Sequence, residues 1–309
     1  MKKVKIALYD QEGYTQHLAE YMCRKNYKIF ETRLFTSMEG LKKYLEKNTI
    51  DVLLIGEEVV SELSEAMHCI CECILLSAGN FVAEGSRYDT IFKYQSAEQI
   101  VKELLSLIAE DDSISFIAPD ISKKAGEIIG VYAPYGGAGV TSIALRMGKE
   151  LAKEGKVLYI SLELFGGISF TEEGKKQEKM TTLRGMSEVI FYLKQGKEKL
   201  AIKLASLIQQ KGELDCIAAV EDYRDLYQIT AGEMKVLLQV LLEETCYEKI
   251  VFDIGYLSDA TLYLLQCANR VYMPAGKGEM QKNKQEGFFK LLQRENLLEL
   301  RSQIQFVEE

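Results

Sequence analysis

The chain has 309 residues, of which 47% are hydrophobic and 27% charged, so it is long enough for two domains and too apolar to be disordered. Its formal charge of −8 gives no global positive field, and we expect no specific nucleic-acid partner. The N-terminal apolar run is broken at Asp10, too early for the core of a signal peptide, and no transmembrane segment is evident. We therefore expect a globular protein that stays in the cytoplasm.

The first 110 residues alternate short apolar runs with helical patterns, which is typical of β–α units that stack on a parallel sheet. The predicted strands lie in 4–10, 28–35, 51–56, 73–79 and 89–94. The predicted helices lie in 14–25, 38–48 and 97–111. We expect a flavodoxin-like α/β domain over residues 1–110, followed by a linker over 111–127, where Pro119 interrupts the pattern.

A second α/β series begins at Ile128. Its predicted strands lie in 128–134, 156–163, 214–220, 249–255, 270–276 and 303–307. Its predicted helices lie in 141–155, 187–194, 198–211, 231–244 and 276–296, the last packed on the sheet, with a membrane-surface helix as the alternative. This series predicts a larger parallel-sheet domain with flanking helices over residues 128–309.

A glycine-rich turn, "VYAPYGGAGVTS" at 131–142, joins the first strand of this series to its first helix. In a phosphate-binding loop, glycines let backbone N–H groups close around phosphates, a lysine adds charge, and a Ser or Thr hydroxyl reaches Mg²⁺. Thr141 and Ser142 open the helix, but Val140 stands where the lysine belongs. Tight packing without a ligand is the alternative explanation of the glycines.

An acidic residue at the end of a later strand strengthens the prediction of a phosphate site. In "KIVFDIG", four residues ending in Phe252 precede Asp253, as a Walker B strand would place a carboxylate near Mg²⁺. Taken alone, Asp253 would be a helix cap or a turn residue.

These motifs, together with "KVLYISLELFGG", resemble in their order the MinD/ParA group of deviant Walker ATPases, whose loop typically reads KGGxGKTT. The resemblance runs from about Ile128 to the end of the chain. Within that group the chain is most similar to the TadZ/CpaE branch, because its first domain looks like a response-regulator receiver. The resemblance implies a MinD/ParA-like P-loop fold with ATP and Mg²⁺ as ligands.

Specific positions carry over from the family by alignment with its motifs. The nucleotide-binding residues would be Tyr135, Gly136, Gly137, Ala138, Gly139, Val140, Thr141 and Ser142. Thr141 and Asp253 would serve Mg²⁺, and Glu163 would be the weak catalytic candidate left from the family's acidic pair. The family's two lysines fall on Tyr135 and Val140. Their loss removes the cations that would neutralise a transferred phosphoryl group, so we expect a weak ATPase at most.

The receiver-like domain departs from its own family. A receiver needs an aspartate at the end of its third strand, where this chain has Gly56, so no phosphoaspartate can form. Asp10, Ser77 and Lys93 imitate the acidic, hydroxyl and lysine positions. Glu57 is expected to be a solvated loop residue, with a constitutive phosphomimic as the alternative. We interpret the domain as an atypical receiver kept for protein contacts.

The resemblance also implies partners. Tyr223, Arg224 and Asp225 would border a homodimer interface, unless they form an ordinary loop with an exposed ion pair. The partners would be pilus or secretion machinery proteins, at a cell pole or with an inner-membrane-associated protein. The function implied is a localisation and assembly factor for a tight-adherence (Flp) pilus; a cycling MinD-type ATPase and a nucleotide-free scaffold remain the alternatives.

Overall fold

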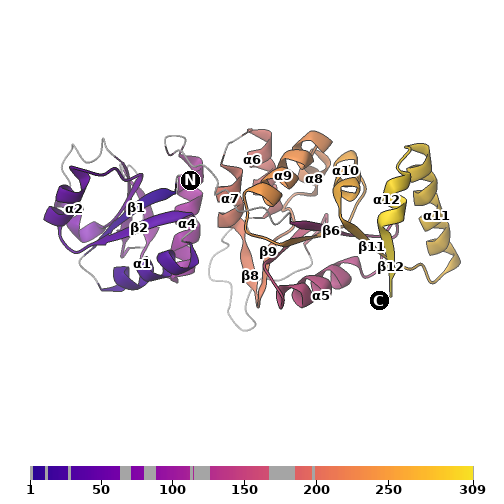
Figure 1. Cartoon of the computed structure of the whole chain (residues 1–309), viewed down its shortest axis with the longest axis horizontal. Coiled ribbons are helices and arrows are strands. Elements are labelled where there is room, and N and C mark those ends of the chain that lie inside the picture. The colour runs from indigo at the N-terminus through magenta and orange to yellow at the C-terminus, as the bar shows by residue number, and fades with distance from the viewer. Residues whose placement is uncertain are drawn as a thin grey trace. The chain divides into compact units, whose positions relative to one another are not determined.

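The protein contains two sheets, one of parallel strands and one of mostly parallel strands, each with its own helices (Figure 1). The computed structural model describes residues 3–10, 13–26, 29–62, 71–79, 88–111, 114, 126–166, 185–196 and 199–308. The chain divides into two compact units, Met1–Asp120 and Ile121–Glu309. The predicted α/β class, with one parallel sheet followed by a second with flanking helices, is confirmed.

The first unit is a five-stranded parallel sheet in the order β2-β1-β3-β4-β5, which is the flavodoxin-like order. Its strands are β1 (Val4–Tyr9), β2 (Phe30–Phe35), β3 (Val52–Gly56), β4 (Glu72–Ser77) and β5 (Asp89–Phe92). Its helices are α1 (Tyr14–Lys25), α2 (Met38–Leu45), the 3₁₀ helix η1 (Glu57–Glu62) and α4 (Ala97–Glu110). The central strand β3 is apolar and buried along its whole length, as a strand covered on both faces must be.

Two helices of this unit, α2 and α4, begin at serine cap residues. Ser37 begins α2 and accepts a hydrogen bond from the Gly40 amide at 3.2 Å, and Ser96 begins α4 in the same way with the Gln99 amide. The predicted apolar stripe of α4 is buried, which fixes that helix on the sheet.

The second unit is a seven-stranded sheet in the order β12-β11-β6-β10-β7-β9-β8, parallel except for the edge pair β8 and β9. Its strands are β6 (Glu127–Tyr132), β7 (Val157–Leu162), β8 (Gln209–Lys211), β9 (Leu214–Ile217), β10 (Lys249–Ile254), β11 (Arg270–Pro274) and β12 (Ile304–Val307). Its helices are α5 (Val140–Ala152), α6 (Met186–Lys194), α7 (Leu200–Leu207), α8 (Tyr223–Tyr227), α9 (Ala231–Glu243), α10 (Asp259–Cys267), α11 (Glu279–Arg294) and α12 (Leu298–Gln303).

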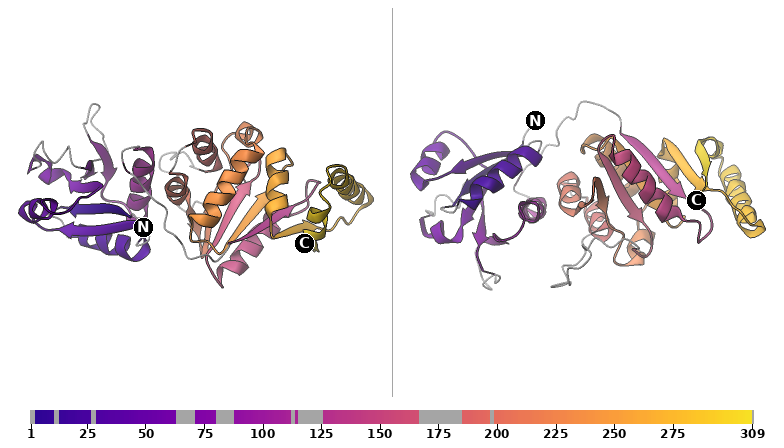
Figure 2. Two further views of the ribbon diagram at one scale, coloured as in Figure 1. Left: turned by 45° about the horizontal axis from the view of Figure 1, so that its top comes forward. Right: turned by 90° about the horizontal axis from the view of Figure 1, so that it is seen from below.

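Helices cover both faces of this second sheet. α5 packs on one face, where its residues Ile143 and Ala144 meet the buried side chains of β6, β7 and β10. α9 and α10 lie on the opposite face, and α11 follows β11 near the β12 edge (Figures 1 and 2). The prediction that the 276–296 segment packs on the sheet is confirmed, because Phe288 of α11 is buried against Tyr132. In the described part of the chain, no helix is both long and apolar enough to cross a membrane.

Several local features of the structure differ from the predictions. The helix predicted over 198–211 ends at Leu207, and β8 follows it, because a turn at Gly212, with a φ of 68°, folds β8 back onto β9. The polar stretch after β9 contains the short helix α8, which Asp222 caps by accepting from the Arg224 amide at 2.9 Å. Helix α10, with Ser258 as its cap, was not predicted.

Candidate functional site

The glycine turn lies at the carboxyl end of β6, between the ends of β10 and β11. Ligands of open parallel sheets bind at this edge of the sheet. Gly137 and Gly139 both have a φ of 69°, a left-handed conformation that residues with a Cβ rarely adopt. Gly139 begins α5 without a side-chain cap, so the first amides of a 13-residue helix are left for a ligand.

A cavity of about 560 Å³ lies over this turn. Its walls are residues 132–142, Glu163 after β7, residues 254–256 at the end of β10, and Lys284 of α11. The structure thus brings every predicted loop residue together with Glu163 in one hollow of the size that small-molecule ligands fill. Two of its walls, Tyr256 and Lys284, were not predicted from the sequence.

Acidic and hydroxyl groups converge at one end of the loop. The Thr141 hydroxyl donates to Oε1 of Glu163 at 3.2 Å. Asp253 is fully buried, and its Oδ2 accepts from the Tyr159 hydroxyl at 2.6 Å. Its Oδ1 is also buried and has no hydrogen-bond partner in the part of the chain that the structure describes. A buried carboxylate oxygen without a partner is costly unless something else satisfies it.

Burial governs the protonation of both carboxyl groups. It raises the pKa of Asp253, against the opposing effects of the Tyr159 and Thr141 hydroxyls. It also raises the pKa of Glu163, and the neighbouring charge of Asp253 raises that pKa further. A divalent cation would relieve this cost, because it favours the charged form of both groups.

The donor set fits Mg²⁺. Carboxylate and hydroxyl oxygens are the ligands that this cation takes, and Asp253 offers an oxygen that has no other partner. Thr141 and Asp253, the two predicted ligands, come from the first turn of α5 and from β10, which pack against each other. When bound, Mg²⁺ would supply positive charge against the oxygens of a phosphate.

A glycine after β10 makes room for Glu163. A Cβ built on Gly255 would overlap the Glu163 carboxylate, so only a glycine allows that side chain to turn toward Thr141. The sequence shows Gly255 only as the end of a strand motif, and its role depends on a neighbour 92 positions away in the chain, which no local pattern predicts.

Tyr135 is held inside the second unit. Its side chain is 8% exposed, and its hydroxyl donates to the Pro274 carbonyl at 2.8 Å. Gln285 of α11 donates to the same carbonyl at 2.9 Å. Tyr135 therefore lines the cavity with its ring while its polar end ties the loop to β11 and α11.

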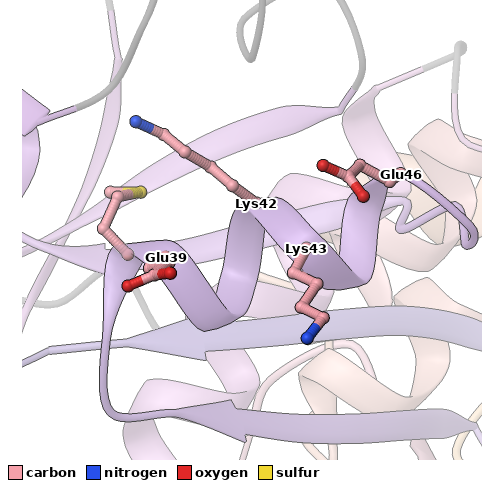
Figure 3. A pocket seen from close by; sticks show the side chains of 5 residues that line it. Glu39, Lys42, Lys43 and Glu46 are labelled. Atoms are coloured by element: carbon pink, nitrogen blue, oxygen red, sulfur yellow. The ribbon is translucent and has the colours of Figure 1, made fainter.

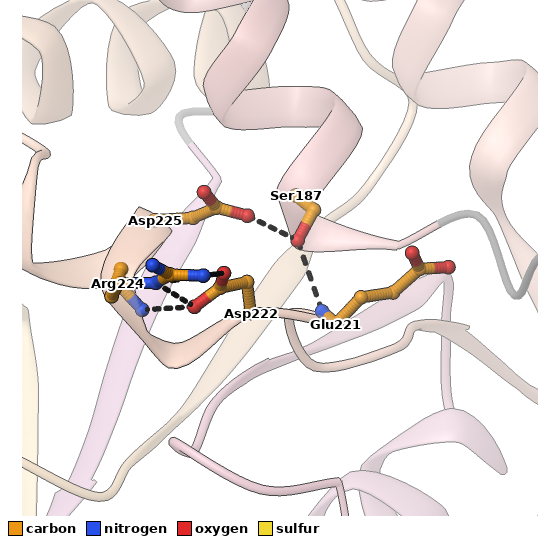
Figure 4. Close-up of polar contacts among 5 residues, drawn as sticks. All are labelled: Ser187, Glu221, Asp222, Arg224 and Asp225. Atoms are coloured by element: carbon orange, nitrogen blue, oxygen red, sulfur yellow. Dashed lines mark hydrogen bonds and ion pairs between the residues drawn. The ribbon is translucent and has the colours of Figure 1, made fainter.

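The predicted interface residues Tyr223, Arg224 and Asp225 lie together on α8. Figure 4 shows two of them, Arg224 and Asp225. Arg224 pairs with Asp222 through two nitrogens, and Asp225 accepts from the Ser187 hydroxyl at 2.6 Å. Both polar side chains are thus engaged within this unit. Tyr223 is 46% exposed.

Tyr223 belongs to a row of aromatic side chains that leads to the cavity. Its ring centroid lies 6.4 Å from those of Phe165 and Tyr227, and the Tyr227 ring lies 5.3 Å from that of Tyr256, which lines the cavity. Phe165 is 79% exposed. Exposed aromatic side chains of this kind are typical of contact surfaces.

The matching edge of the first sheet is filled by its own side chains. A Cβ on Gly56 would lie 2.7 Å from the Asp10 carboxylate, so an aspartate at this position would collide with it. The Ser77 hydroxyl and the Ala78 amide both donate to the Glu57 carboxylate, the amide at 3.1 Å. The prediction that Glu57 is a solvated loop residue is therefore wrong.

A buried lysine completes this edge. Lys93, whose side chain is fully buried, donates to Oε1 of Glu58 at 2.6 Å. This contact lowers the pKa of Glu58. Ser77 and Lys93, at the hydroxyl and lysine positions of the receiver-like unit, thus donate to the two adjacent glutamates of η1.

The first unit has a hollow of its own, which lies along α2 (Figure 3). The described residues that line it are Met38, Glu39, Lys42, Lys43 and Glu46. These side chains all belong to one helix, and their charges balance, so among the described residues they offer no converging set for a ligand.

No family model and no curated protein matches the chain. Similar solved structures include a plasmid partition protein from Borrelia burgdorferi, with 21% identity over 60% of this chain and 78% of that one and a TM-score of 0.46. A ParA family ATPase from Chlorobium tepidum TLS is 16% identical over 60% and 74% of the two chains, with a TM-score of 0.46. The cell division ATPase MinD from Pyrococcus furiosus is 14% identical over 59% and 71%, with a TM-score of 0.41. Likenesses of this size leave the function to be argued from the site.

Proposed function

We propose that the second unit binds ATP with Mg²⁺ and turns it over slowly. The observation that carries this proposal is the buried Asp253 Oδ1 without a partner, next to Thr141 at the start of a helix that follows two left-handed glycines. A turn that served only for packing would have no use for such a costly oxygen.

The absence of both lysines affects hydrolysis more than binding. Backbone amides and the dipole of α5 still attract phosphates, whereas Tyr135 and Val140 cannot neutralise charge that develops during transfer. One charged hydrogen bond contributes about 1.5–3 kcal/mol, so its loss weakens binding roughly 10- to 100-fold. We expect ATP to bind in the micromolar to millimolar range that cells supply.

For the cellular role, we propose a localisation and assembly factor for a Flp pilus or related secretion machine. The order of the motifs and the receiver-like first unit support this role, as the TadZ/CpaE resemblance implies. In this proposal ATP favours a homodimer, since a ligand shifts the population toward the state that binds it best. The exposed Tyr223 and Phe165, in a row with the cavity residue Tyr256, support a contact surface near the nucleotide.

The test is to quantify nucleotide released from the purified full-length chain by denaturation, after incubation with millimolar ATP and Mg²⁺, and to follow phosphate release separately. We expect close to one ATP per chain and turnover below about one per minute, slower than enzymes with a full set of catalytic cations. Faster turnover would favour a cycling MinD-type ATPase. An empty site would contradict ATP binding and favour a nucleotide-free scaffold.

A further inference from the structure

The cavity over the phosphate loop has an unbalanced charge. Glu163 lines it, and Asp253 lies buried beneath it, whereas positions 135 and 140 of the loop carry no cation. A triphosphate that enters this hollow is itself strongly anionic. Amides, a helix dipole and one Mg²⁺ offset part of that charge, but phosphate sites in proteins usually add a lysine or an arginine.

One cationic side chain does line the cavity, and it comes from outside the loop. Lys284, on α11, is the only lysine or arginine among the described residues of the cavity wall. It is exposed, and no carboxylate of the described part of the chain lies within 4.0 Å of its ammonium group. Other lysines of this unit, such as Lys153 and Lys194, are paired with glutamates. The charge of Lys284 is therefore available to a ligand.

The helix that carries Lys284 is fixed against the phosphate loop. Gln281 accepts hydrogen bonds from the amides of Lys277 and Gly278, at 2.8 and 3.2 Å, and so holds the start of α11. One turn later, Gln285 donates to the Pro274 carbonyl that also accepts from Tyr135.

Lys284 shares a face of α11 with Gln281 and Phe288, which both hold this helix in place. It is three residues after Gln281 and four before Phe288, whose ring centroid lies 5.3 Å from that of Tyr132 at the start of the loop segment. Residues three and four apart lie on the same face of a helix. The packing that fixes α11 therefore also fixes Lys284 at the cavity.

We propose that Lys284 contacts the phosphate chain of the bound nucleotide and supplies the positive charge that Val140 and Tyr135 do not. The inference rests on the proposed function and deepens it. It predicts that the site selects for polyphosphate, because the contact is to phosphate and not to the base. It also predicts that the contact belongs to the same chain, because α11 packs on its own loop.

The test compares four versions of the full-length chain by calorimetry with Mg·ATP and with adenosine: wild type, Lys284→Gln, Lys284→Arg and Lys282→Gln. Lys282 is a matched control, since it is exposed on the same helix and does not line the cavity. We expect Lys284→Gln to weaken Mg·ATP binding about tenfold or more and to reduce its salt dependence, in line with the loss of one charged hydrogen bond. Lys284→Arg should stay close to wild type, as should Lys282→Gln, and adenosine binding should not change.

The outcomes separate this inference from the proposed function. If wild type binds Mg·ATP and Lys284→Gln binds it equally well, the inference is wrong and the proposed function stands. If wild type does not bind Mg·ATP, the proposed function fails and the inference fails with it. If Lys282→Gln weakens binding as much as Lys284→Gln, the effect is one of general charge, and the specific contact is contradicted. Lys284→Glu provides a second variant, expected to bind more weakly than Lys284→Gln.

Discussion

At the carboxyl edge of the first sheet, carboxylates meet partners from the same unit: Glu57 accepts from Ser77, and Glu58 accepts from the buried Lys93. At the equivalent edge of the second sheet, Asp253 has one buried oxygen without a hydrogen-bond partner among the described residues. Glu163 accepts a hydrogen bond from the Thr141 hydroxyl. Parallel sheets place their functional loops at this edge in both units. The first edge holds its two glutamates, Glu57 and Glu58, with its own side chains, whereas the second edge carries a cavity open to a ligand.

The contrast shows how one kind of fold is used either for structure or for binding. Glu57 and Glu58, whose carboxylates already have partners in their own unit, gain little from a cation. An edge with an unsatisfied oxygen, left-handed glycines and uncapped helix amides gains stability when a ligand arrives. The pKa directions agree with this difference, since the pKa of Glu58 is lowered while those of Asp253 and Glu163 are raised.

The largest expected effect comes from removing the carboxylate that pairs with Lys93 at the edge of the first sheet, which should lower the stability of the first unit. Glu58→Gln removes the Glu58 carboxylate from the buried Lys93 ammonium, and we expect the first unit to lose about 2 kcal/mol, less than for a fully buried pair because Glu58 is 45% exposed. Adding Lys93→Met should restore most of that loss. Hydrogen exchange of the β3 to β5 peptides measures the change. Equal protection in wild type and Glu58→Gln would show that the pair does not stabilise the edge.

A pair of adjacent glycines tests the open edge next. Ala in place of Gly137 must adopt a left-handed φ, which costs about 1–2 kcal/mol, whereas Gly136 has no such φ. A Cβ meets nothing within 4 Å at either position, so only the backbone conformation differs. We expect Gly137→Ala to weaken Mg·ATP binding roughly tenfold and Gly136→Ala to have little effect, as measured by calorimetry. A larger loss for Gly136→Ala would contradict the assigned loop geometry.

The pH dependence of the two edges should have opposite signs. The lowered pKa of Glu58 gives the first unit stability above the unfolded pKa, which is lost as the pH falls through the folded pKa. The raised pKa values of Asp253 and Glu163 mean that, without Mg²⁺, the second unit loses stability as the pH rises from their unfolded values through their folded values.

Mg²⁺ should reverse the behaviour of the second edge only. Its affinity should increase as the pH rises through the raised pKa values, because the cation needs charged carboxylates. Asp253→Asn should flatten this increase, while Asp259→Asn, on the exposed start of α10, serves as the control. Thermal melts at several pH values, with and without Mg²⁺ and ATP, report both effects. An unchanged Mg²⁺ response in Asp253→Asn would remove Asp253 from the metal site.

The smallest effect concerns the connection between the loop and α11. Tyr135→Phe removes only the hydroxyl that donates to Pro274, and Gln285 still donates to that carbonyl. We expect a loss of about 1 kcal/mol in stability and a weakening of Mg·ATP binding of only a few-fold. Unfolding in urea and calorimetry measure the two quantities. A complete loss of binding would mean that Tyr135 contacts the nucleotide directly.

Much of the open edge could be predicted from local patterns. A strand, three glycines and a helix start place the loop at a sheet edge, and parallel strands bring Glu163 and Asp253 to the same edge. The alternation of strands and helices also predicts both sheets. These features depend on neighbours in sequence or on a general rule of parallel sheets, so one sequence is enough to show them.

Other features depend on tertiary packing and could not be predicted in this way. Lys284 is an ordinary polar position of an amphipathic helix until Gln285 and Phe288 fix that helix beside the loop. Glu57 follows a strand like a solvated residue, and only the position of Ser77 on the next strand gives its carboxylate a partner. Such contacts join segments whose spacing in the sequence carries no period.

Hydrogen exchange of the full-length chain with and without millimolar Mg·ATP tests the difference between the two edges most directly. We expect slower exchange at residues 135–143, and at 279–288 where α11 contacts the loop, together with unchanged exchange at 52–58 and 72–78 of the first sheet. Unchanged exchange in 135–143 at saturating Mg·ATP would contradict the account, because the loop would then not be a nucleotide site.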